Sequence, residues 1–160
     1  MGDLSRNLSW SELLRGSGYD ALEDVPDDIR ANAENMAASM FQPLRDSLGF
    51  PLSVLAGGGL RSASMNRRVG GARTSQHLAG RGCDLRGPSE THTLQIYDRA
   101  KDMQASGLIP AGGLALYLRK DGTVRFVHVD CRGRRARWNG GARKLALARG
   151  KSSPAWACCC

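Results

Sequence analysis

A β-hairpin in the last third of the chain is the feature that most constrains the fold. The segments "LALYL" at 114–118 and "VRFVHVD" at 124–130 are rich in β-branched, aromatic and leucine side chains. Lys120-Asp121-Gly122 lies between them, and an Asp-Gly turn between two such runs is typical of a hairpin. The sequence therefore predicts two antiparallel strands here.

A long helix is predicted in the N-terminal half. Pro26, Asp27 and Asp28 suit its first turn, because proline needs no backbone partner there and acidic side chains favour the positive end of the helix dipole. Gly49 suits its end, and Pro43 predicts a kink between the two. Apolar residues at helical spacing make one face: Ile29, Ala33, Met36, Met40, Leu44 and Leu48.

Two shorter helices are also predicted. The segment "LSWSEL" near the N-terminus indicates a helix with Ser9 or Ser11 as its cap. Ser89 caps a helix over 90–106, which Gly107 ends. The side chains expected to face inward from this helix are Leu94, Tyr97, Ala100 and Met103.

The remaining segments complete an α+β domain. "PLSVLAGG", from Pro51, and residues 83–86 are predicted strands, whereas the glycine- and serine-rich residues 57–75 form a long structured loop. A loop of that length inside a compact domain is usually functional or disordered. We expect one domain over residues 1–140 and a basic, flexible tail over 141–160.

Composition excludes several kinds of protein. No apolar run approaches the roughly 18 residues that cross a bilayer, so membrane insertion is not expected. The net charge of +8 favours an anionic partner. Only Trp138 and Trp156 stand among the late basic residues, with no nucleic-acid-binding motif, so no nucleic-acid partner is expected. The N-terminus lacks a signal pattern, which predicts synthesis in the cytoplasm.

Two of the three histidines stand near carboxylates. His77 precedes Asp84 by seven residues, and His128 precedes Asp130 by two. On a strand, side chains two apart share a face, so His128 and Asp130 project together. Two histidines and one carboxylate are a common catalytic zinc set, and a further carboxylate can take the proton from bound water. Spacing alone leaves a structural role for His128 equally open, and His92 is expected to lie away from the site.

Several motifs together carry a resemblance to a known family. They are G-L-R-S (59–62), Asn66, V-G-G (69–71), S-Q-H-L-A-G (75–80), Asp84, F-V-H-V-D (126–130), R-G (132–133) and R-W (137–138). Over about residues 4–139 the chain resembles the zinc D-Ala-D-Ala carboxypeptidase family. Fold relatives of that family include D-Ala-D-Ala dipeptidases, murein endopeptidases and the hedgehog signalling domain. The resemblance implies a small antiparallel sheet with helices packed on one side, and one zinc ion per chain.

The resemblance also implies roles for single residues. It places His77, Asp84 and His128 on the zinc ligands. Arg61 falls on the arginine that steadies the substrate carbonyl or the oxyanion, and Ser75 falls on a serine that lines the substrate site. Without the resemblance, Arg61 would be interpreted as a loop arginine paired with Asp84.

The chain departs from the family pattern at three places. Leu60 stands where tyrosine is usual, and Gly82 where alanine is usual. Arg125 stands three residues before His128, where several relatives place the Glu or Asp that acts as general base. We therefore predict Asp130 as the base. The alternative is that Asp130 only orients His128 or an arginine from behind.

These features predict a zinc-dependent peptidase that hydrolyses peptidoglycan peptides, of D-Ala-D-Ala carboxypeptidase or murein endopeptidase type. We expect it to act on the cell wall, as a phage lysin released by lysis or carried on a virion. The alternative is a non-catalytic zinc-containing domain that binds cell wall or serves in a virion. The bond that is cut and the oligomeric state are left open.

Overall fold

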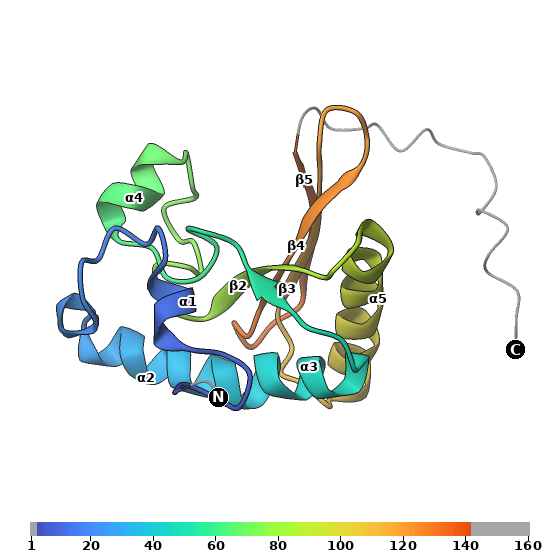
Figure 1. The fold of residues 1–160 in the computed structure, drawn as a ribbon, viewed down its shortest axis with the longest axis horizontal. Coiled ribbons are helices and arrows are strands. Elements are labelled where there is room, and N and C mark those ends of the chain that lie inside the picture. Colours follow the sequence, from blue (N-terminus) through green and yellow to red (C-terminus); the bar gives the residue numbers. More distant parts are fainter. Residues whose placement is uncertain (1–2, 142–160) are drawn as a thin grey trace, which may run out of the picture.

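A five-stranded sheet forms the centre of the structure, a computed structural model that describes residues 3–141 (Figure 1). The strands are β1 (Ser53–Val54), β2 (Gly82–Arg86), β3 (Gly113–Leu118), β4 (Val124–Asp130) and β5 (Ala136–Gly141). Their order in the sheet is β1-β2-β4-β3-β5. The predicted hairpin is present as β3 and β4, and the α+β class is confirmed.

The sheet is mixed rather than purely antiparallel, because β5 pairs in parallel with β3. No strand was predicted after residue 130, so the sequence analysis missed β5. The chain leaves β4 beside the start of β3 and crosses to the free edge of β3, where Gly133 N–H donates to Ala111 and Ala136 N–H to Gly112. Because β5 then begins at the same end as β3, it runs in the same direction. From residue 142 on, the predicted tail lies outside the described residues.

The helices are α1 (Trp10–Leu14), the 3-10 turn η1 (Leu22–Asp24), α2 (Asp27–Met36), the π-helical segment η2 (Ala37–Phe41), α3 (Gln42–Leu48), α4 (Ala63–Arg68) and α5 (Glu90–Ser106). Ser9 caps α1 in a capping box with Glu12. The short helix α4 lies within the predicted loop 57–75. No helix among the described residues is long and apolar enough to cross a membrane.

The predicted long helix is continuous from α2 through η2 to α3, and Gly49 ends it at a φ of 73°. Its predicted apolar face is buried at Met36, Met40 and Leu44. Pro43 lies just after the π-helical segment. Proline has no N–H for the preceding turn and its ring crowds that turn, so the wider π turn accommodates it without ending the helix.

Helix α5 begins and ends as its capping residues predict. The Ser89 side chain accepts from His92 N–H, and Gly107 has a φ of 77°. Its buried face differs from the prediction at one position, since Leu94 is 40% exposed and Ile96 is fully buried. Side chains two positions apart on a helix point about 200° away from each other. Leu94 therefore cannot share the face on which Ile96 and Ala100 lie.

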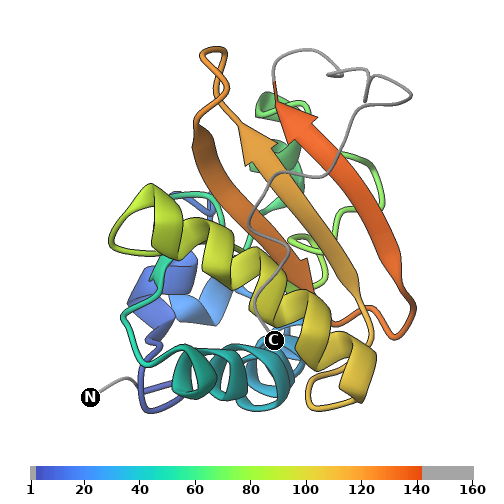
Figure 2. The ribbon, with the colours of Figure 1, turned by 90° about the vertical axis from the view of Figure 1, so that its right-hand side faces the viewer.

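The two faces of the sheet have different surroundings. Helix α5 lies across one face (Figure 2), and the buried side chains Cys83, Leu85 and Val127 belong to the hydrophobic core. Asp84 and His128 alternate with these residues and point to the opposite face. There the segment that carries α4 stands across from β4 and β5 (Figure 1). The functional site lies between that segment and the sheet.

Candidate metal centre

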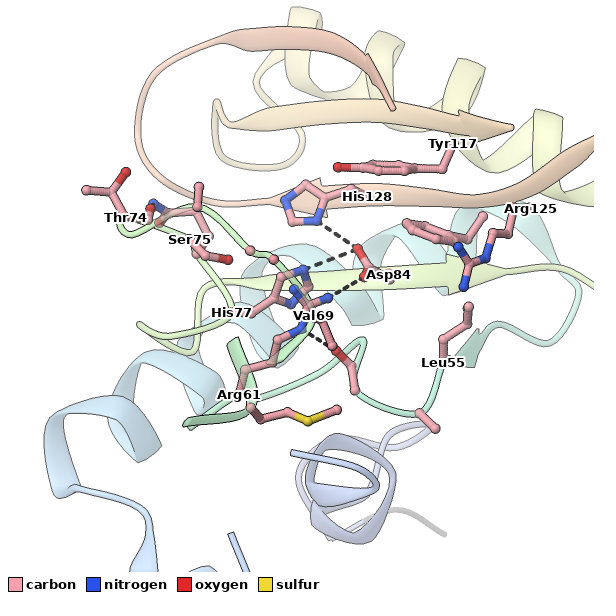
Figure 3. A pocket seen from close by; sticks show the side chains of 18 of the residues that line it. Leu55, Arg61, Val69, Thr74, Ser75, His77, Asp84, Tyr117, Arg125 and His128 are labelled. Atoms are coloured by element: carbon pink, nitrogen blue, oxygen red, sulfur yellow. Dashed lines mark hydrogen bonds and ion pairs between the residues drawn. The ribbon is translucent and has the colours of Figure 1, made fainter. Parts of the chain in front are cut away.

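Three side chains converge on one point at this face. His77, Asp84 and His128 each offer a ligand atom, and these atoms lie within 4.8 Å of one another. His77 Nε2 is 3.2 Å from Asp84 Oδ1, and His128 Nδ1 is 2.9 Å from the same oxygen (Figure 3). All three side chains are buried. The structure thus brings together the three residues predicted as metal ligands.

The sheet and one tight turn produce this convergence. Strands β2 and β4 pair with Asp84 directly opposite His128, which places the two side chains on the same face. His77 comes from the turn before β2. In that turn Gly80 has a φ of 69°, and a Cβ there would lie 2.5 Å from the Ile29 carbonyl oxygen. Only glycine fits that conformation and that close approach, so Gly80 lets the chain return to the site.

Hydrogen bonds on the far side of each imidazole decide which nitrogen is available to a metal. His77 Nδ1 lies 2.8 Å from the Gly59 carbonyl oxygen, so it must be the protonated nitrogen that donates. His128 Nε2 lies 3.0 Å from Asp130 Oδ2 and donates to that carboxylate. His77 Nε2 and His128 Nδ1 are the nitrogens that lie against Asp84 Oδ1. A proton on either nitrogen donates to that oxygen, and release of the proton leaves a lone pair that can bind a metal there. Two neutral imidazoles and a carboxylate, each oriented from behind, fit the donor chemistry of zinc.

Hydrogen bonds within the site shift the pKa values of Asp84 and His128. Burial by itself would raise the pKa of Asp84, but hydrogen bonds from His128 and His77 outweigh it and hold that pKa well below its usual range. Burial would lower the pKa of His128, whereas its hydrogen bonds to Asp130 and Asp84 raise it. Asp84 is therefore a carboxylate at neutral pH, as a metal ligand must be.

Arg61 contacts the outer oxygen of the metal-ligand carboxylate. One guanidinium nitrogen lies 2.9 Å from Asp84 Oδ2, and Nε donates to the Gly57 carbonyl. This is the pairing that residue chemistry alone suggests for Arg61. The guanidinium also lines the pocket beside the site. The two placements are compatible, because the fork of an arginine can hold a carboxylate and still present donors to another group.

Asp130 lies behind His128 and is fully buried. Its carboxylate accepts from His128 Nε2, from Gly113 N–H at 2.8 Å and from Arg132 Nε at 2.9 Å. Burial would raise the pKa of Asp130, but the bonds from His128 and Arg132 hold it well below its usual range. Because Nε2 and Nδ1 lie on different sides of the imidazole, the position of Asp130 favours the orienting role over the base role.

Gly82 and Leu60 fit this arrangement. A Cβ at Gly82 would lie 3.0 Å from Asp130 Cβ and 3.1 Å from His128 Cε1, so glycine leaves room for that pair against β2. Leu60 is 1% exposed and joins the hydrophobic core.

The three side chains open onto a pocket of about 690 Å³. Ser75 lines it, together with Arg61. His92 lies elsewhere, as expected, with its ring 4.6 Å from that of Phe50 and its Nδ1 bonded to Ser89.

Three aromatic side chains, Tyr117, Phe126 and Trp138, form one wall of the pocket. The sequence analysis did not assign them to the site. The Tyr117 and Phe126 rings stack at 4.4 Å, and Trp138 Nε1 donates to the Tyr117 hydroxyl at 3.2 Å. All three line the pocket, and the Trp138 ring lies 5.4 Å from that of His128. The signal for Phe126 was its position two residues before His128 on one strand. Trp138 belongs to the R-W motif of the resemblance, but its position beside the site was not predicted, because β5 was not predicted.

A small α+β domain with a buried His-Asp-His centre at the base of an open pocket is the arrangement of a metal-dependent hydrolase. Comparison with known families refines this class. The model of the Peptidase M15 family matches residues 20–130, so the chain belongs to that family. The family is one of zinc-binding peptidases, which implies a peptide substrate and confirms the resemblance noted from the sequence. A comparison with curated proteins found no match.

Proposed function

We propose that the chain is a zinc-dependent peptidase that hydrolyses peptide bonds of peptidoglycan, of D-Ala-D-Ala carboxypeptidase or murein endopeptidase type. The observation that carries the proposal is the direction of the donors: His77 Nε2, His128 Nδ1 and Asp84 Oδ1 face one point at the base of an open pocket. Zinc held by these residues would supply a bound water with a pKa of about 7 and a Lewis acid.

The other residues of the site have distinct tasks in this proposal. Arg61 carries a fixed positive charge at the pocket wall, where it can donate to the substrate carbonyl oxygen and to the charge that develops on it. Ser75 lines the pocket, where its hydroxyl can bond the peptide backbone. Asp130 holds the ring of His128 in one orientation and one tautomer.

The proposed place of action is the bacterial cell wall, reached as a phage lysin released by lysis or carried on a virion. A net charge of +8 supports this, because it favours association with anionic wall polymers.

Digestion of purified peptidoglycan tests the proposal. Zinc-loaded wild type is expected to contain one zinc per chain and to release soluble peptides, detected by mass spectrometry, and a chelator should stop the release. His77→Ala should lose both zinc and activity. His92→Ala is the matched control, since His92 lies outside the site, and it should keep both. If zinc-loaded, folded wild type releases nothing from walls of several chemistries, the catalytic assignment fails.

A second candidate function is a non-catalytic zinc-containing domain that binds cell wall or serves in a virion. One observation favours it: among residues 3–141, Asp84 is the only carboxylate that lines the pocket. A separate base for the attacking water is therefore not apparent at the pocket surface. Zinc-dependent co-sedimentation with peptidoglycan, without any released product, would support this function over the first.

A further inference from the structure

A β-bulge directs Arg125 toward the pocket. In the pairing of β3 with β4, Tyr117 lies opposite Phe126, but the next residue, Leu118, lies opposite Val124. Arg125 is therefore the extra residue of a bulge. In a regular strand it would alternate with Phe126 and point toward α5. Instead, Arg125 lines the pocket (Figure 3). Phe126 lines it as well.

Arg125 forms no ion pair with any of the described residues. Arg61 is paired with Asp84 and Arg132 with Asp130. No carboxylate within residues 3–141 forms an ion pair with Arg125. Residues 142–160 contain no Asp or Glu side chain. The guanidinium of Arg125 is therefore a positive charge in the pocket that an anionic ligand can neutralise.

The surroundings of Arg125 suit an anion attached to a small apolar group. Its guanidinium carbon lies 5.5 Å from the centroid of the Phe126 ring, which stacks on Tyr117. Arg125 is exposed, so an anion that it binds stays partly in water, while the Phe126 ring offers an apolar surface to the group that carries the anion. The planar fork of an arginine matches the two oxygens of a carboxylate.

We propose that Arg125 is a specificity-determining residue that binds a free carboxylate of the peptide substrate beside the metal centre. This inference rests on the proposed peptidase function and deepens it. The carboxylate has two possible sources, the C-terminal α-carboxylate or a side carboxylate of an internal residue. The first would make the chain a carboxypeptidase, and the second would favour cleavage within longer peptides.

Three synthetic stem peptides separate these sources: one with all carboxylates free, one with a C-terminal amide, and one with the internal carboxylates amidated. Each is mixed with zinc-loaded wild type, Arg125→Gln, Arg125→Lys, and the control Arg99→Gln. Arg99 is exposed on α5, away from the pocket. Affinity is read within milliseconds from tryptophan fluorescence, to which Trp138 contributes. Turnover is followed in the same samples by mass spectrometry, and circular dichroism verifies folding.

We expect amidation of the recognised carboxylate to weaken binding to wild type and Arg99→Gln by about 10- to 100-fold, as loss of a charge-assisted hydrogen bond does. Arg125→Gln should bind the free and amidated peptides alike, and Arg125→Lys should recover part of the preference. The amidated peptide that loses affinity identifies the source.

The subsite is overturned if folded Arg125→Gln still binds the free peptide more tightly than the amidated peptide, to the same extent as wild type. It is also overturned if wild type binds the two peptides equally. Binding that depends on Arg125 without any hydrolysis would support the subsite while the proposed peptidase function fails. Hydrolysis whose preference for the free carboxylate is the same in wild type and Arg125→Gln would support the peptidase function and overturn the subsite.

Discussion

Replacement of Asp130 by asparagine separates the two roles considered for this residue. Asp130 is fully buried and accepts hydrogen bonds from His128, Gly113 and Arg132. Asparagine keeps the shape but has one acceptor oxygen and an NH₂ group. That NH₂ group must face at least one of the three donors. The substitution therefore leaves a buried donor without a partner and removes the charge opposite Arg132.

The structure sets the expected magnitudes. Breaking a buried ion pair costs about 3–5 kcal/mol, and the Arg132 side chain, 20% exposed, keeps some contact with water. We expect the metal-free variant to lose about 2–4 kcal/mol of unfolding free energy. His128 also loses the charged acceptor that keeps its proton on Nε2. Such outer partners are worth about 10- to 100-fold in metal affinity, or about 1.4–2.7 kcal/mol.

Competition with a chromophoric chelator measures zinc affinity, urea unfolding measures stability, and turnover is measured at saturating zinc. Asp102→Asn, on the exposed side of α5, is the control and should match wild type in all three. Loss of turnover with zinc affinity unchanged would refute the orienting role and restore Asp130 as the general base.

Four further predictions concern other parts of the molecule. At saturating zinc, Arg61→Gln should lower kcat by about 10²- to 10³-fold, as loss of an oxyanion donor does; unchanged kcat at saturating zinc and peptide would exclude that role. Burial raises the pKa of the Cys83 thiol, so iodoacetamide should label Cys83 in urea but not in the native protein, as peptide mapping would show. The same shift should lower the unfolding free energy of wild type, relative to Cys83→Ala, by about 1.4 kcal/mol per pH unit above about pH 8.5, because only the unfolded thiol ionises there. Gly80→Ala would place a Cβ against the Ile29 carbonyl at positive φ, so urea unfolding should show a loss of more than about 1 kcal/mol.

Signals that act within a few residues were sufficient to predict several elements. The cap at Ser89 and the glycine at Gly107 lie next to the ends of α5, and both ends were predicted correctly. The β-branched and aromatic residues of "VRFVHVD", together with the Asp-Gly turn before them, gave the bounds of β4, Val124–Asp130. Strand β5 was missed, because its pairing partner lies across a crossover and its own residues, Ala136–Gly141, include no β-branched side chain.

The sequence by itself determined which chemical groups the site contains. The spacing in its last strand placed His128 and Asp130 on one face, and its motifs predicted His77 and Asp84 as further residues of the site. Tertiary structure alone decided how those groups are turned. Gly59 and Asp130 select the nitrogens that face Asp84, and the pairing of β3 with β4 turns Arg125 into the pocket. Ring orientation and strand register depend on hydrogen bonds between segments far apart in the chain, which local patterns do not encode.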